Sequence, residues 1–108
     1  MDKREIDTEI LSSIKEYLAI VGEHYRIDAA YLFGSHARGD IHEWSDVDLA
    51  IVSKDVKDRI GDMARMFVFA KDIDALIEPH PFNTKDFYGN QYMMADEIIK
   101  NGIPIPLS

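Results

Sequence analysis

Residues 32–52 of the chain, LFGSHARGDIHEWSDVDLAIV, join two apolar runs through a polar segment. The first run stops at Gly34-Ser35. The second alternates, so that Asp46 and Asp48 share one face of a predicted strand while Val47 points to the other face. Charges on a largely apolar strand are costly unless a partner compensates them. A divalent metal ion is the partner that this pair of acids favours.

Outward from this stretch, apolar residues recur at helix or strand spacing along the chain. We predict strands at 29–33, 46–52 and 73–78, and helices at 6–22, 56–70 and 90–101, with one or two helical turns at 35–39. The apolar stripe of the second long helix is Val56, Ile60, Met63, Phe67 and Val68. The PHPFN segment is predicted as a loop, and the tail IPIPLS as an edge strand, because proline cannot donate to a sheet ladder. This order of elements predicts a small α/β domain.

The size and composition of the chain favour one domain covering residues 1–108. The sequence has 108 residues, of which 46% are hydrophobic, enough for one compact core. No apolar run approaches the ~20 residues that a membrane helix needs, and the N-terminus is charged. We therefore expect no membrane association and a cytoplasmic location. The absence of cysteine excludes disulfides and thiolate zinc sites.

The charge of the chain bears on its partners. A formal net charge of −8, with no cluster of basic residues, argues against direct binding of nucleic acid. An acidic surface suits a basic protein partner, and it equally suits plain solubility.

A third acid is predicted to join Asp46 and Asp48. Residues two apart on a strand have α-carbons about 6.6 Å apart, so both carboxylates can converge on divalent ions. Asp74, on the strand predicted at 73–78, would join them if that strand lies beside the first, and Glu78 shares its face. Oxygen ligands favour Mg²⁺, or alternatively Mn²⁺, over zinc. His24, His42 and His80 are predicted as surface or loop histidines, and none is assigned to a metal.

The other end of the motif suits a phosphate group. Gly34 lets the backbone approach a ligand closely, and Ser35 offers a hydroxyl and the amide groups of a helix start. Arg38, one turn later, supplies a cation. Phosphate donors beside metal-binding acids are the two halves of a phosphoryl or nucleotidyl transfer site.

Gly34-Ser35, ten residues, then Asp46-Val47-Asp48 closely resembles the GS-x10-DxD signature of the DNA polymerase beta-like nucleotidyltransferase superfamily. The fuller GSHARG...SDVDLAIV is similar to its minimal nucleotidyltransferase branch. The resemblance implies a polymerase beta-like α/β fold, with a mixed sheet of three to four strands flanked by helices. It also implies roles: Gly34 and Ser35 for the triphosphate, with Arg38 as a pyrophosphate contact, and Asp46, Asp48 and Asp74 as the catalytic, metal-binding acids for two Mg²⁺ ions.

The resemblance further implies transfer of AMP or another nucleotide from an NTP, taken as ATP, to a hydroxyl group. In the minimal branch it implies pairing with a HEPN-type helical protein encoded alongside, often a toxin, to which the nucleotidyltransferase acts as antitoxin. A partner or a second copy of the chain would complete the acceptor site. Two alternatives stay open, namely a binding module that neutralises its partner by occlusion, and a nucleotidyltransferase acting on a small molecule.

Overall fold

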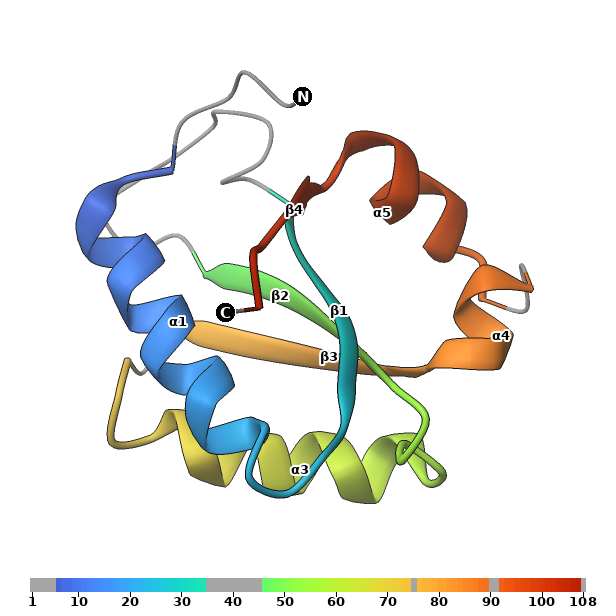
Figure 1. Ribbon diagram of the computed structural model, residues 1–108, viewed down its shortest axis with the longest axis horizontal. Helices are drawn as coiled ribbons and strands as arrows, with labels where there is room; N and C mark the ends of the chain where they lie inside the picture. Colours follow the sequence, from blue (N-terminus) through green and yellow to red (C-terminus); the bar gives the residue numbers. More distant parts are fainter. Residues whose placement is uncertain (1–5, 35–45, 75, 90–91, 108) are drawn as a thin grey trace.

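A four-stranded sheet in the order β3-β2-β1-β4 forms the centre of the computed structural model (Figure 1). The structure describes residues 6–34, 46–74, 76–89 and 92–107. The strands are β1 (Ile27–Phe33), β2 (Val47–Ser53), β3 (Ile77–Asn83) and β4 (Ile103–Pro104). Strand β1 runs antiparallel to both β2 and β4, whereas β2 and β3 are parallel. The sheet is therefore mixed, and the predicted α/β fold is confirmed.

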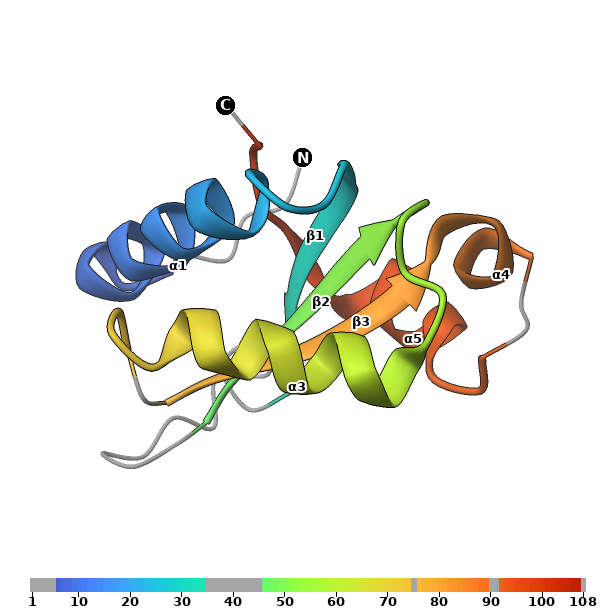
Figure 2. The same ribbon diagram turned by 90° about the horizontal axis from the view of Figure 1, so that it is seen from below.

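Helices cover both faces of this sheet (Figure 2). They are α1 (Thr8–Val21), α3 (Arg59–Ala70), α4 (Thr84–Tyr88) and α5 (Ala95–Asn101). Helices α1 and α3 pack on one face, and α4 and α5 on the other, so the buried side chains form two clusters. In the described part of the chain, no helix is long and apolar enough to cross a membrane.

Helix α1 follows from the spacing of its apolar residues and from its cap. The side chain of Asp7 accepts hydrogen bonds from the backbone N–H groups of Glu9 and Ile10, which closes the first turn. The buried face includes Tyr17, whose hydroxyl donates to the backbone carbonyl of Met66 at 2.8 Å. That bond ties α1 to α3. The helix ends before Gly22, as predicted.

Strand β2 shows the predicted alternation. Val47, Leu49 and Ile51 are buried under α1 and α3, whereas Ala50 and Val52 are buried under α4 and α5. Because side chains two apart share a face, Asp48 belongs to the α4 and α5 side of the sheet.

The third strand corrects the prediction. In place of a strand at 73–78 followed by a loop, β3 spans Ile77–Asn83 and includes both Pro79 and Pro81. Strand β3 lies at an edge of the sheet, so only one of its sides pairs with a neighbouring strand. Pro79 and Pro81 are two residues apart and therefore present their backbones to the same side. Because that side can face away from β2, the N–H groups that the prolines lack are not needed for pairing. Consistent with this, the Pro81 carbonyl accepts a hydrogen bond from the Arg59 side chain at 2.9 Å.

The buried face of α3 also differs from the predicted stripe. Asp62, Met66 and Ala70 are buried, while Ile60 and Val68 are 84% and 65% exposed. The polar Asp62 is tolerated inside because its carboxylate accepts from the Tyr25 hydroxyl at 2.7 Å and from the backbone N–H groups of residues 57 and 58. These bonds, more than the apolar pattern, determine which side of the helix faces the core.

Among its described residues, the last third of the chain has one more helix than predicted. Helix α4 begins directly after β3, where the Asn83 side chain accepts from the backbone N–H groups of Lys85 and Asp86. The helix predicted at 90–101 begins only at Ala95. The predicted edge strand in the tail is confirmed, because β4 pairs with β1 at the far edge of the sheet.

Replacing Asp62 by asparagine is expected to destabilise the fold by about 2 kcal/mol, since buried donors would lose a charged acceptor. Burial alone would raise the pKa of Asp62, but the Tyr25 hydroxyl and the two backbone N–H groups outweigh it and hold that pKa below its usual value. The stabilisation is therefore present above the unfolded pKa of about 3.9 and is lost as pH falls through the folded pKa. Urea unfolding at pH 7 and pH 3 would measure both effects. The exposed Asp58, replaced in the same way, is the control, and an equal loss there would contradict the role of Asp62.

Candidate active site

Acidic side chains from two adjacent strands meet on the α4 and α5 side of the sheet. Asp48 in β2 lies opposite Glu78 in β3 in the parallel register. Asp46 directly precedes β2, and its side chain lies close enough to Glu78 to raise the pKa of that carboxyl group. Asp46 and Asp48 therefore share a face, as predicted, and the acid that joins them is Glu78.

The electrostatics of Glu78 reflect this crowding. Its pKa is raised, first because partial burial disfavours the charged carboxylate, and second because the negative charge of Asp48 repels it. Asp46 adds to the rise in this pKa, and His80 opposes it. A bound cation would relieve the same repulsion.

Gly34 brings the start of the glycine-serine motif against the acids. It follows β1, whose last residue, Phe33, pairs with Asp48, and it has a φ of +73°. A Cβ added at Gly34 would collide with Oδ2 of Asp48. The glycine is thus required both for its left-handed backbone and for this close approach. Ser35 and Arg38 lie outside the described residues, so their phosphate-binding roles stay predictions.

Asp74 lies elsewhere than predicted. It sits in the turn between α3 and β3, not on a strand, and its Oδ1 accepts a hydrogen bond from the backbone N–H of Leu76 at 2.9 Å. This is the usual behaviour of an aspartate that shapes a turn. The strand predicted to carry Asp74 begins three residues later, at Ile77, which leaves Glu78 beside Asp48.

His80 is a site residue that the sequence interpretation missed. Its Nε2 lies 3.2 Å from Oδ1 of Asp48 and 3.7 Å from Oε1 of Glu78. Its ring packs edge-on against Phe33, with ring centroids 5.0 Å apart. The sequence signal for His80 is its spacing from Glu78, because residues two apart share a face of a strand. The neighbouring prolines hid this signal, since they favour a loop.

The grouped side chains form a set of donors suited to a divalent ion. Ligand atoms of Asp48, Glu78 and His80 all lie within 4.8 Å of one another. Two carboxylates favour Mg²⁺ or Mn²⁺, and an added imidazole is compatible with a transition metal. The residues present therefore fit a metal centre.

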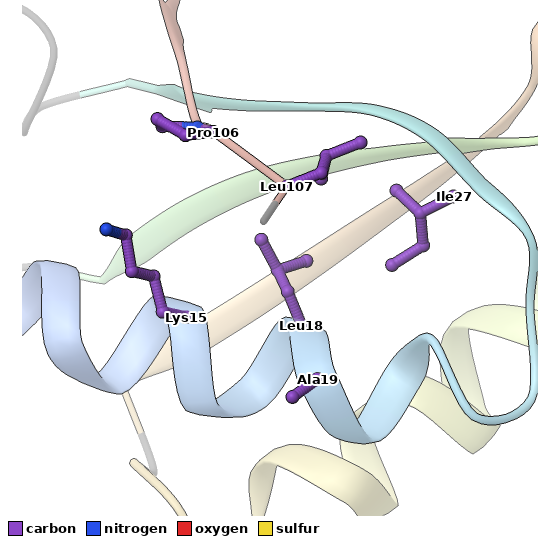
Figure 3. Close-up of a pocket in the computed structure, with 6 residues that line it drawn as sticks. All are labelled: Lys15, Leu18, Ala19, Ile27, Pro106 and Leu107. Atoms are coloured by element: carbon purple, nitrogen blue, oxygen red, sulfur yellow. The ribbon is translucent and has the colours of Figure 1, made fainter.

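Two cavities bear on where a substrate would bind. One of about 260 Å³ adjoins Gly34 on the α5 side and is lined by Phe33, Gly34, Met94, Glu97, Ile98, Asn101 and Gly102. A larger one of about 320 Å³ lies between α1, β1 and the C-terminal tail, where Leu18 and Ile27 point inward beside Leu107 (Figure 3). Leu18 and Ile27 belong to the core on the opposite face of the sheet from the acids. The smaller cavity is therefore the one connected to the site.

Comparison with known proteins agrees with this geometry. The family model described as Polymerase beta, Nucleotidyltransferase matches residues 12–106. The chain belongs to this nucleotidyltransferase family. The predicted superfamily is thereby confirmed, and the minimal branch is consistent with the match.

A solved structure shows the same fold. The crystal structure of a protein from Sulfolobus solfataricus, assigned there as a nucleotidyltransferase, is 21% identical to this chain, with a TM-score of 0.62. The similarity covers 95% of this nucleotidyltransferase and 90% of the other chain. No curated protein matches the sequence significantly.

Proposed function

We propose that this nucleotidyltransferase is metal-dependent and transfers a nucleoside monophosphate, AMP from ATP, to a hydroxyl group. One observation carries the proposal: Asp48 and Glu78 lie side by side on β2 and β3, with Asp46 close to Glu78 and Gly34 against Asp48. Acids for a metal thus adjoin Gly34, the first residue of the motif that is predicted to bind the phosphates. This is the arrangement that nucleotidyl transfer requires.

The metal role follows from the donors. Asp46, Asp48 and Glu78 would hold the ions, with Glu78 in the position predicted for Asp74. Bound Mg²⁺ or Mn²⁺ would neutralise charge on the triphosphate and orient it for in-line attack. Asp48 and Glu78 are held on two paired strands, which lowers the cost of arranging their carboxylates around the ions.

The nucleotide would lie along the end of β1. Gly34 and Ser35 would bind its phosphates, with Arg38 on the leaving pyrophosphate. The cavity between Gly34 and α5 is suited to the nucleoside, because its apolar walls carry polar groups from Glu97 and Asn101. This placement keeps the α-phosphorus beside Asp48.

The proposed reaction is a displacement at the α-phosphorus. The acceptor oxygen bonds to the α-phosphorus, while the bond to the bridging oxygen breaks and pyrophosphate leaves with that electron pair. The proton of the acceptor hydroxyl passes to a carboxylate.

The acceptor is proposed to be a hydroxyl on a HEPN-type helical protein, to which this enzyme acts as antitoxin. Support comes from the resemblance of the motif to the minimal branch and from the net charge of −8, which would attract a basic partner. Exposed apolar side chains on α3, Ile60 and Val68 among them, are also suited to contact with another protein. We propose a cytoplasmic location on the same grounds.

Incubation with Mg²⁺ and α-labelled ATP, with and without the product of the neighbouring gene, tests the proposal. Intact mass of every chain should then show one or more AMP units on the partner. The Asp46→Asn variant should show none while folding normally. A stable complex with no added mass would instead favour neutralisation by occlusion. Label found only on small molecules would overturn the protein acceptor and favour the small-molecule alternative.

A further inference from the structure

We infer that His80 is a metal ligand of this site, through Nε2, and that it shifts the selectivity of the site from Mg²⁺ toward Mn²⁺ and Co²⁺. This inference rests on the proposed metal-dependent function and deepens it. His80 follows Glu78 by two residues on β3, so both side chains project from one face of the strand toward Asp48. The acids alone would make an all-oxygen centre.

The distances favour ligation. Two ligand atoms that each lie about 2.1 Å from one ion are about 3.0 Å apart at a right angle and about 3.4 Å apart at a tetrahedral angle. Nε2 of His80 lies 3.2 Å from Oδ1 of Asp48 and 3.7 Å from Oε1 of Glu78. The three side chains are thus spaced almost as ligands of a single ion. Small rotations of the Glu78 side chain, which is 37% exposed, would close the remaining gap.

The imidazole ring is held in place before any ion arrives. The His80 side chain is only 15% exposed, and its ring lies edge-on against Phe33. Phe33 is itself fixed by the pairing of β1 with β2 at Asp48. With the ring proton on Nδ1, Nε2 offers its lone pair to the metal. Little conformational freedom is lost on binding, so the nitrogen adds affinity.

A nitrogen donor changes which metal the site prefers. Carboxylates suit Mg²⁺ and Mn²⁺ alike, whereas imidazole binds transition metals much better than it binds Mg²⁺. The affinity for Mn²⁺ should therefore depend on His80, and the affinity for Mg²⁺ much less. A histidine acting only by hydrogen bonding to Asp48 would affect both metals alike.

Electron paramagnetic resonance of the protein loaded with Mn²⁺ tests the inference without an activity assay. Electron spin echo modulation from a directly bound imidazole nitrogen is expected in the wild type and should vanish in His80→Ala. That variant should also bind Mn²⁺ about tenfold more weakly, with less than about a threefold change for Mg²⁺ measured by competition. The sequence has four histidines, so H24A/H36A/H42A, which keeps His80 alone, should retain the modulation. This triple variant keeps the test decisive if His80→Ala does not fold.

Four results would overturn the inference. Bound Mn²⁺ without nitrogen modulation, or modulation lost in the triple variant, would remove His80 as a ligand while leaving the proposed function standing. Equal weakening of Mn²⁺ and Mg²⁺ in His80→Ala would mean that the histidine only positions Asp48. If Asp48→Asn leaves Mn²⁺ binding unchanged, the ion does not bind at the proposed centre, and the proposed metal-dependent function is overturned as well.

Discussion

Replacing Glu78 by glutamine is expected to lower nucleotidyl transfer by about a thousandfold, because the site loses one of its metal-binding carboxylates. Glutamine keeps the size of the side chain and its place in β3 but carries no negative charge. The initial rate of pyrophosphate release at saturating ATP and Mg²⁺, with the acceptor present, measures the effect. Circular dichroism of the variant confirms that the sheet is intact.

Asp74→Asn is the matched control for Glu78, because it tests the acid that the sequence pattern favours. The asparagine side chain can still accept the hydrogen bond from Leu76 that shapes the turn before β3. We expect the transfer rate of this variant to stay within about threefold of wild type, as for a surface change outside a metal site. The opposite ranking, with Asp74 essential and Glu78 dispensable, would return the third metal position to Asp74.

Replacing Gly34 by alanine should damage both stability and activity. A left-handed backbone with a Cβ costs about 1–2 kcal/mol, and φ at Gly34 is +73°. The added Cβ would also collide with Oδ2 of Asp48, so this carboxylate must move. Displacement of a catalytic group by about 1 Å lowers rates by about a hundredfold. Thermal unfolding and the transfer rate, measured on the same preparation, would report the two losses.

Gly61→Ala is the matched control for Gly34. Gly61 lies in α3, where the atom nearest to a new Cβ is Oδ2 of the exposed Asp58, at 2.6 Å, and that side chain can rotate away. Alanine in an exposed helix position stabilises by up to about 1 kcal/mol relative to glycine. The control should therefore keep full activity and equal or greater stability. If both variants lost activity equally, the close approach of Gly34 to Asp48 would not be what matters.

The local parts of the fold could be predicted from the sequence because their causes lie within a few neighbouring residues. The alternation that begins just before β2 places Asp46 and Asp48 on one face whatever the rest of the chain does. The spacing of apolar residues in α1 and the glycine that ends it act over one or two turns. The same is true of Gly34, because a glycine that ends a buried apolar run indicates a close backbone approach from the local pattern alone.

Helix α3 shows where such local reasoning fails. Its apolar pattern predicts one buried face, yet the buried carboxylate of Asp62 bonded to Tyr25 holds the helix with Ile60 exposed. The partner of Asp62 is 37 residues away in the sequence. No periodicity within a helix can report a contact of that kind.

The sequence by itself therefore determined the family, the α/β class and the pair of acids at β2. Only the tertiary structure decided which third acid and which histidine join them. Asp74 and Glu78 lie four residues apart, and the choice between them depends on where β3 begins. That start is set by pairing with β2, which aligns Glu78 with Asp48 and brings His80 to the same face. The register between two strands depends on contacts between segments that are distant in the sequence. The edge position that accommodates Pro79 and Pro81 likewise exists only once the sheet has formed.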